Sequence, residues 1–168
     1  MLLKQERAEE EHIGLLIGAV RRRITQALGS SVRRYHLTPR QFWILVALYE
    51  YPGLSLGELT AHLRMDDPTA SRVIFALMNR KLVQVKNDAA DRRRSRLYLG
   101  PSGATLGKEL HDLATAVRAA TTEGLSMSER KALRTCLRKI IANMDRFQAQ
   151  NLNNGPPARK GSQTRGSL

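Results

Sequence analysis

The chain has 168 residues, a length that favours one domain and is sufficient to bury a core. With 42% hydrophobic and 26% charged residues it has the composition of a soluble globular protein, and no stretch approaches the roughly 18 uninterrupted apolar residues of a membrane span. A net charge of +13 and a pI near 10.8 indicate a polyanionic partner, either nucleic acid or an anionic membrane surface. Residues 1–11 lack the apolar region of a signal peptide, so we expect a cytoplasmic protein.

The first predicted element is a long amphipathic helix from Ala8 to Tyr35. Its apolar residues recur every three or four positions and form one stripe along the helix. They are Ile13, Leu16, Ile17, Val20, Ile24, Leu28, Val32 and Tyr35. The stripe is longer than one small domain needs, so we expect part of it to pack on another subunit.

A second helix is predicted from a capping box that Thr38 forms with Gln41, and Pro39 suits its first position. The segment from Phe42 to Tyr49 is almost wholly apolar and is therefore expected to be buried. The helix ends at the Tyr-Pro-Gly sequence of residues 51–53.

Two more helix starts follow in close succession. Ser55 and Glu58 form a second capping box, which begins a short helix through Leu63. The sequence Asp66-Asp67-Pro68 gives the next start, an acidic cap followed by proline, and this helix is expected to run to about Arg80. The residues predicted to face inward on this helix are Val73, Ile74, Leu77 and Met78.

A β-hairpin is predicted next, because residues 82–86 and 96–99 alternate between apolar and polar and are joined by a polar turn. Pro101 then begins a helix, and Ser126 with Glu129 caps the last one. The last helix carries its own apolar stripe of Leu133, Leu137, Ile140, Ile141, Met144 and Phe147. Residues 151–168 are expected to form a flexible basic tail.

The short helix, tight turn and following helix of residues 55–81 have the order of a helix-turn-helix, in which the second helix enters the major groove of DNA. The start of that helix, from Pro68, suits this contact, because small side chains allow close approach and helix N–H groups attract phosphate. Thr69 and Ser71 can bond to base edges or phosphates, and Arg72 can reach a guanine or a phosphate. Taken alone, this segment is explained equally well by an ordinary surface helix start.

Four arginines lie within five positions of the predicted hairpin: Arg92, Arg93, Arg94 and Arg96. Projecting arginines on a narrow hairpin can enter a minor groove, where the negative potential is focused. Asp91 precedes them and would oppose DNA binding unless it orients an arginine. A solvated charge run is the usual alternative, but the helix-turn-helix immediately upstream favours contact with DNA.

From Ile13 to Phe147 the chain resembles the MarR family (multiple antibiotic resistance regulators). The signature of that family is Asp-x-Arg, five residues and then Leu-Thr-x-x-Gly, and Asp91, Arg93, Leu99 and Gly103 have this spacing. Gly100 replaces the threonine of the signature. Glycine is a weaker N-cap than threonine, which predicts a less firmly fixed start of the next helix.

The resemblance implies a role for each charged residue of the hairpin. Arg93 would insert into the minor groove, and Asp91 would brace it. The remaining arginines, Arg92, Arg94 and Arg96, would contact phosphates.

Two further positions depart from the family pattern. Phe75-Ala76 stands where relatives often have Asp-Arg, and Lys81 stands where they tend to have glycine. The first departure either removes a backbone contact or adds core packing, and the sequence does not choose between these alternatives.

The expected fold is mainly α with a small β-hairpin wing, a winged helix-turn-helix with long N- and C-terminal dimerisation helices. We expect one domain over residues 1–150, with residues 8–37 and 101–150 as dimerisation helices and residues 38–100 as the DNA-binding unit. The family implies a homodimer, and two-fold symmetry predicts a pseudo-palindromic operator with half-sites roughly 10 bp apart.

Family members often bind a small, frequently aromatic, anionic effector between the dimer helices and the DNA-binding unit. Arg22 is the candidate partner for its carboxylate, with Trp43 or Tyr49 as an apolar wall and His12 as a further candidate. The alternatives are that residues 21–23 are solvated arginines and that Trp43 belongs to the core. No clustered His, Cys or carboxylate spacing indicates a metal site, and no cofactor is expected.

The sequence therefore predicts a transcription regulator that binds double-stranded DNA specifically and acts as a ligand-responsive repressor. The alternative is an architectural protein that binds any duplex through the same charge. An enzyme is not expected, because the chain has no Gly-rich phosphate loop, no nucleophile with a plausible base and no paired carboxylates in an evident cleft. The adjacent pair Asp66-Asp67 is explained by the start of a helix.

Overall fold

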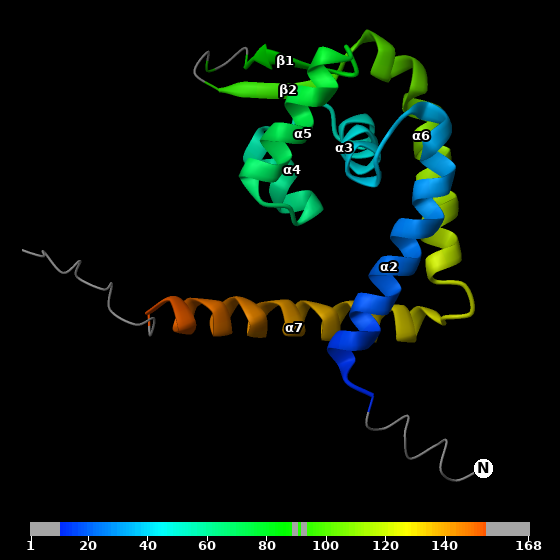
Figure 1. Cartoon of the computed structure of the whole chain (residues 1–168), viewed down its shortest axis with the longest axis vertical. Coiled ribbons are helices and arrows are strands. Elements are labelled where there is room, and N and C mark those ends of the chain that lie inside the picture. Colours follow the sequence, from blue (N-terminus) through cyan, green and yellow to red (C-terminus); the bar gives the residue numbers. More distant parts are fainter. Residues whose placement is uncertain (1–10, 89–90, 92–93, 154–168) are drawn as a thin grey trace, which may run out of the picture. The chain divides into compact units, whose positions relative to one another are not determined.

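The computed structural model describes residues 11–88, 91 and 94–153, and these residues form helices and one β-hairpin, as predicted (Figure 1). The chain divides into two compact units, of which the first ends at Thr121 and the second begins at Thr122. The elements of the first unit are α2 (Ile13–Val32), the 3-10 turn η1 (Arg33–Tyr35), α3 (Pro39–Glu50), α4 (Leu56–Leu63), α5 (Asp67–Asn79), β1 (Val83–Asn87), β2 (Ser95–Leu99) and α6 (Pro101–Thr121). The second unit contains α7 (Met127–Asn153).

The first described helix, α2, is shorter than the predicted helix. It begins beyond His12, whose Nδ1 accepts a hydrogen bond from the N–H of Gly14 (3.2 Å), and the predicted start at Ala8 lies outside the described residues. It ends at Val32 and is followed directly by η1, which ends at His36 in a left-handed conformation (φ 54°). The predicted single helix is therefore an α-helix followed by a 3-10 turn.

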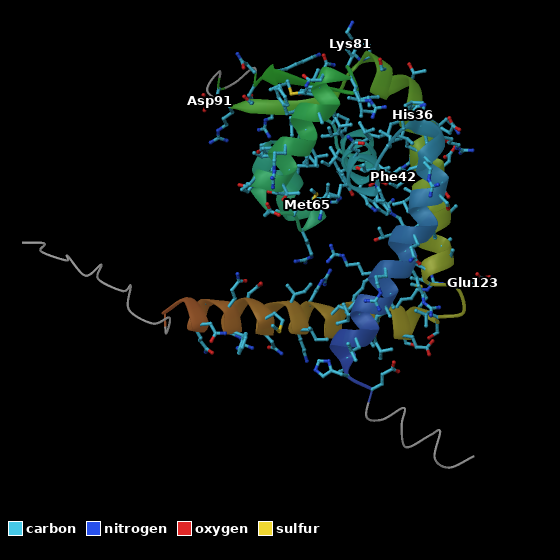
Figure 2. The ribbon with its side chains drawn as sticks, viewed as in Figure 1. His36, Phe42, Met65, Lys81, Asp91 and Glu123 are labelled. Atoms are coloured by element: carbon cyan, nitrogen blue, oxygen red, sulfur yellow. The ribbon has the colours of Figure 1, made fainter. Side chains whose placement is uncertain are left out.

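The core of the first unit is built around α3. The predicted capping box is present, with Thr38 Oγ1 accepting from the N–H of Gln41 (3.3 Å) and Gln41 Oε1 accepting from the N–H of Thr38 (2.9 Å). The expected burial of α3 is confirmed for Phe42, Ile44, Leu45, Val46, Ala47 and Leu48. It is wrong for Tyr49, which is 39% exposed near the end of the helix, and Trp43 is only half-buried. Because α3 packs against α2, α4, α5, α6 and β2, Phe42 is surrounded by side chains from several elements (Figure 2).

The inward face of α5 differs in part from the prediction. Ile74 and Leu77 are buried as expected, and Val73 is half-buried. Met78 was expected to face inward, but its side chain is 39% exposed. The reason is that Ala70 also lies against the core, which centres the buried side between Ala70 and Leu77 and leaves Met78 on its flank.

The wing is a two-stranded antiparallel hairpin. Val83 lies opposite Leu99 and Asn87 opposite Ser95, so the register extends over the full length of both strands. Leu54, between α3 and α4, adds a single bridge to Leu97 on the other side of β2. The hairpin is therefore attached to the segment that leads into α4.

The end of α5 is a Schellman motif, in which Lys81 takes the left-handed conformation (φ 56°) that glycine usually occupies. The N–H of Lys81 donates to Met78 O (2.9 Å), and the N–H of Leu82 donates to Leu77 O (3.0 Å). This turn directs the carbonyls of Lys81 and Leu82 toward the start of α6.

Two glycines make room for those carbonyls. A Cβ on Gly100 would lie 2.3 Å from Lys81 O, and a Cβ on Gly103 would lie 2.1 Å from Leu82 O. The sequence suggested only a weak helix cap at Gly100. The structure adds a steric requirement, because no side chain fits between the end of α5 and the start of α6.

Arg80 ties the end of α5 to the corner between α2 and α3. Its Nη1 donates to His36 O (2.7 Å), and its Nη2 lies 3.3 Å from Tyr35 O, which also accepts a hydrogen bond from it. The hydroxyl of Tyr35 in turn donates to Glu109 on α6 (2.5 Å). Three elements of the first unit are thus joined by polar contacts at this corner.

An ion pair also joins α3 to α6. Arg118 donates two hydrogen bonds to the carboxylate of Glu50 (2.5 and 3.1 Å), and His111 Nδ1 lies 3.2 Å from Glu50 Oε1. The Glu50 side chain is only 15% exposed. The hydrogen bonds from Arg118 hold the pKa of Glu50 below its ordinary value, so this carboxylate is favoured in its charged form.

The second unit begins with the predicted capping box, in which Ser126 N–H donates to Glu129 Oε2 (2.7 Å). The helix α7 continues to Asn153, so residues 151–153 are helical rather than part of the predicted tail, and residues 154–168 lie outside the described part. Exposed side chains on α7 include Leu133, Ile141, Met144 and Phe147, all from the predicted apolar stripe.

We expect Gly100→Ala to destabilise the protein by about 1–3 kcal/mol, because the new Cβ overlaps a backbone carbonyl rather than a flexible side chain. Urea unfolding at a fixed protein concentration measures the loss. Gly57→Ala is the matched control, since a Cβ there meets no heavy atom within 4 Å. Equal stability of Gly100→Ala and the wild type would contradict the close approach.

We expect Glu50→Gln to cost about 1 kcal/mol at pH 7, since the half-exposed Arg118 is partly screened by solvent. A lowered carboxylate pKa stabilises the folded state above the unfolded pKa, and this contribution is lost as the pH falls through the folded pKa. The difference in unfolding free energy between the wild type and Glu50→Gln should therefore shrink as the pH is lowered below about 4.5. A difference that stays constant from pH 7 to pH 3 would refute this.

Candidate nucleic-acid interface

The turn between α4 and α5 is tight and well capped. Arg64 ends α4 in the left-handed conformation (φ 50°), and Asp66 begins α5 by accepting a hydrogen bond from the N–H of Thr69 (2.8 Å). The hydrogen bonds from Thr69 lower the pKa of Asp66, which keeps a negative charge at the helix N-terminus. The two helices thus have the local geometry of the predicted helix-turn-helix.

The start of α5 presents most of its predicted contact residues to solvent. Pro68, Ser71 and Arg72 are exposed, whereas Thr69 is half-buried beside the buried Ala70. Arg72 Nε donates to the carbonyl of Pro68 (3.3 Å), which holds the side chain along the first turn. Arg72 therefore lies on the outward side of the helix with its charge accessible.

The tip of the wing is closed by backbone hydrogen bonds. The N–H of Asp88 donates to Arg94 O (2.8 Å), and the N–H of Arg94 donates to Asp91 O (2.9 Å). Arg94 Nε also lies 3.4 Å from Asp91 Oδ2, and Figure 2 shows Asp91 at the end of the hairpin remote from Lys81. The predicted contacts of Arg92 and Arg93 fall outside the described residues.

Arg96 has a different environment from the other arginines of the hairpin. Its guanidinium donates to Asp88 Oδ2 (2.7 Å), to Glu58 Oε2 (2.9 Å) and to the carbonyl of Gly53 (3.3 Å). Only a quarter of the Arg96 side chain is exposed, and the hydrogen bond to Asp88 raises its pKa above the usual range. Arg96 therefore links the hairpin to the start of α4.

Glu58 is the shared acceptor in this link. Its Oε2 also accepts from the N–H of Ser55 (2.7 Å), which completes the predicted capping box of α4. The sequence identified Glu58 as a cap and Arg96 as a phosphate contact, but not their ion pair. The only hint in the sequence was that carboxylates at positions 58 and 88 accompany a basic hairpin. Because Glu58 and Arg96 are far apart in the sequence, no local pattern predicts their contact.

The candidate effector residues lie in two places. Trp43 is half-buried on α3, and the ring of Tyr49 on the same helix contacts that of His111 on α6, with the centroids 5.3 Å apart and the planes tilted by 37°. The Arg118 guanidinium lies 5.6 Å from the centre of the Trp43 ring, beside its ion pair with Glu50. Trp43 and Tyr49 therefore belong to the seam between α3 and α6.

Arg22 and His12 lie on α2 rather than at that seam. Arg22 is exposed, and its guanidinium runs back along the helix toward Gly18. His12 serves as the N-cap of α2. In the described ranges, no three His, Cys, Asp or Glu side chains are grouped as metal ligands, and no helix is both long and apolar enough to cross a membrane.

Several known proteins are similar to this chain in sequence and in fold. A model of the MarR family matches residues 35–94. The transcriptional repressor NicR of Pseudomonas putida is 30% identical over 131 residues, which cover 78% of this chain and 83% of NicR. The structure of BpsR from Bordetella bronchiseptica, whose DNA binding is described as regulated by 6-hydroxynicotinic acid, is 32% identical and covers 77% of this chain and 93% of BpsR, with a TM-score of 0.65.

A more distant structure supports the fold alone. The transcription regulator MarR of Oenococcus oeni is 20% identical, covers 78% of this chain and 99% of its own, and has a TM-score of 0.73. The resemblance predicted from the spacing of Asp91, Arg93, Leu99 and Gly103 is thus confirmed. On its likeness to NicR and BpsR over most of their lengths, the chain belongs to the MarR family of winged-helix transcription regulators.

Proposed function

We propose that this protein represses transcription by binding a specific double-stranded DNA operator as a homodimer, and that a small effector releases it. The observation that carries the proposal is the exposed start of α5, where Arg72 and Ser71 face solvent on a helix that packs against strand β1 of the basic hairpin. Arg96 ties that hairpin to the same helix-turn-helix. An exposed helix start and a basic wing on one rigid unit are suited to reading adjacent grooves.

The start of α5 supplies the major-groove contacts in this proposal. Arg72 reaches a guanine or a phosphate, and Ser71 bonds to a base edge or a phosphate. Pro68 and Thr69 lie at the first turn, where the helix N-terminus favours a phosphate. These contacts give the protein its register on the duplex.

The hairpin supplies contacts to the flanking backbone and minor groove. As the family resemblance implies, Arg93 inserts into the minor groove with Asp91 as its brace, and Arg92 and Arg94 contact phosphates. Arg96 takes another role, because its guanidinium already donates to three protein oxygens. We assign it as a positioning residue that sets the angle of the wing.

The homodimer is supported by exposed apolar side chains at both ends of the chain. On α2 these are Ile13, Leu15, Leu16, Ile17 and Val20, and on α7 they include Leu133, Met144 and Phe147. Apolar surface of this extent is typical of a protein–protein interface. A second copy that covers these faces would create a two-fold axis and a pseudo-palindromic operator with half-sites about 10 bp apart.

The effector proposal draws on NicR, which is named a repressor, and on BpsR, whose DNA binding is regulated by 6-hydroxynicotinic acid. We propose an aromatic carboxylic acid as the effector of this protein. Trp43 and Tyr49 offer aromatic surface, and Arg22 and His12 remain the candidates for polar contact. Loss of DNA binding on addition of 6-hydroxynicotinic acid tests the proposal directly.

Binding of the full-length chain to duplexes selected from a randomised pool tests the main proposal. At about 150 mM salt a specific regulator should prefer the selected duplex over a scrambled one by at least about 1,000-fold. An architectural protein would bind both duplexes equally and with the same salt dependence. We place the protein in the cytoplasm because chromosomal DNA is its proposed partner.

We expect Arg72→Ala to weaken binding to the selected duplex by about 1–3 kcal/mol, since a base or phosphate contact is lost. Fluorescence anisotropy with a labelled duplex measures the change. Lys108→Ala is the control, because it removes one charge from the exposed surface of α6 and should change affinity less than threefold, roughly the 0.5 kcal/mol typical of surface substitutions.

The same variants test the dimer. Sedimentation of the wild type, Arg72→Ala and Lys108→Ala should give a species of twice 18.8 kDa. Unchanged DNA affinity in Arg72→Ala would exclude its assigned role, and a wild-type monomer at micromolar concentration would exclude the dimer.

Arg96→Met should reduce both folding stability and DNA affinity, because Asp88 and Glu58 lose the hydrogen bonds from its guanidinium and the wing loses its link to α4. Arg94→Met should reduce DNA affinity alone, since the side chain of Arg94 is 71% exposed and its ion pair with Asp91 adds little stability. Urea unfolding and anisotropy on both variants separate the two roles. Loss of affinity without loss of stability in Arg96→Met would make it a direct contact instead.

A further inference from the structure

Phe75 is an exposed aromatic residue on α5. Its side chain is 65% exposed, although it stands in the middle of a helix that buries Ala70, Ile74 and Leu77 on its other side. The sequence left open whether Phe75 adds to the core. Its exposure excludes core packing, so its apolar surface is available to a partner of the helix.

The position of Phe75 identifies which partner that is. At about 100° per residue, Phe75 shares the outward side of α5 with Pro68, Arg72 and Asn79, at steps of four, three and four residues. All four are exposed. The face that carries Phe75 is therefore the face that, in the proposed function, enters the major groove.

The chemistry of that groove offers one apolar feature. Among the four bases only thymine presents a methyl group there, and apolar side chains, phenylalanine included, recognise it by contact. Phe75 cannot donate to a phosphate or accept from a base. The neighbouring Ala76 is small and exposed, and Arg72 donates to the carbonyl of Pro68, so its side chain lies along the first turn of the helix.

We propose that Phe75 is a specificity-determining residue that contacts the 5-methyl group of a thymine in the operator. The inference rests on the proposed function, in which α5 lies in the major groove. Phe75 lies about 4.5 Å beyond Arg72 along the helix axis, against about 3.4 Å per base pair. The thymine therefore lies one or two base pairs from the base or phosphate that Arg72 contacts, and a dimer reads it once in each half-site.

The test uses the full-length wild-type protein and a duplex selected from a randomised pool. Each dT is replaced by dU, symmetrically in both half-sites, which removes the methyl group and keeps the base pair. We expect one symmetric pair of positions at which wild-type affinity falls by about fourfold for each methyl, roughly 15-fold in all. Phe75→Ala should bind the dT duplex more weakly than the wild type and lose this sensitivity to dU.

Two further variants make the result specific to Phe75. Phe75→Leu keeps an apolar side chain and should retain part of the sensitivity to dU. Met78→Ala removes another exposed apolar side chain of α5, one on the flank of the buried side, and should retain all of it. Because Phe75 is exposed, Phe75→Ala should unfold at the same urea concentration as the wild type, which excludes a folding defect as the cause.

The outcomes separate this inference from the function on which it rests. If the wild type selects a sequence but no dU substitution weakens it, or if the sensitivity persists in Phe75→Ala, the thymine contact is wrong while specific DNA binding stands. Unchanged DNA binding in Phe75→Ala also overturns the contact and would leave the residue to a protein partner. If the wild type selects no sequence, the proposed function and the inference fail together.

Discussion

The contact between the backbone of Lys81 and Leu82 and the two glycines, Gly100 and Gly103, is the constraint on which the first unit depends. At this corner α5 ends, the wing begins and returns, and α6 starts. Since the carbonyls would lie 2.1–2.3 Å from any added Cβ, the elements meet backbone to backbone. Such a contact tolerates little adjustment, because there is no side chain to repack. The orientation of the wing relative to α5 is therefore fixed before any partner is bound.

Two arginines extend that rigidity to the ends of the DNA-binding unit. Arg96 links the hairpin to the start of α4, and Arg80 links the end of α5 to the carbonyls of Tyr35 and His36. Both guanidinium groups are fixed in position, because each donates hydrogen bonds to oxygens from distant parts of the chain. In a protein with a net charge of +13, the basic residues thus divide into those that build the structure and those that remain open to a polyanion.

The helices and the family could be predicted from the sequence because their signals are local. Thr38, Ser55, Asp66 and Ser126 each cap a helix through a residue three positions away, and each cap is present. What escaped prediction depends on residues far apart in the chain. The exposure of Met78 follows from which side of α5 the core occupies, and the partners of Arg96 come from positions 53, 58 and 88. The helical residues 151–153 were missed because their polar composition carries no periodic signal.

The carboxylate of Glu58 completes the cap of α4 and also receives Arg96 from the wing. One side chain therefore belongs to two elements, and a substitution at this position alters both at once. Because the effects of substitutions at positions 55, 58 and 96 depend on one another, we expect these three positions to covary among homologues. A residue that holds the wing at its angle thus also caps α4. Since none of these three positions lies on α5, substitutions on α5 can change DNA specificity without altering the angle of the wing.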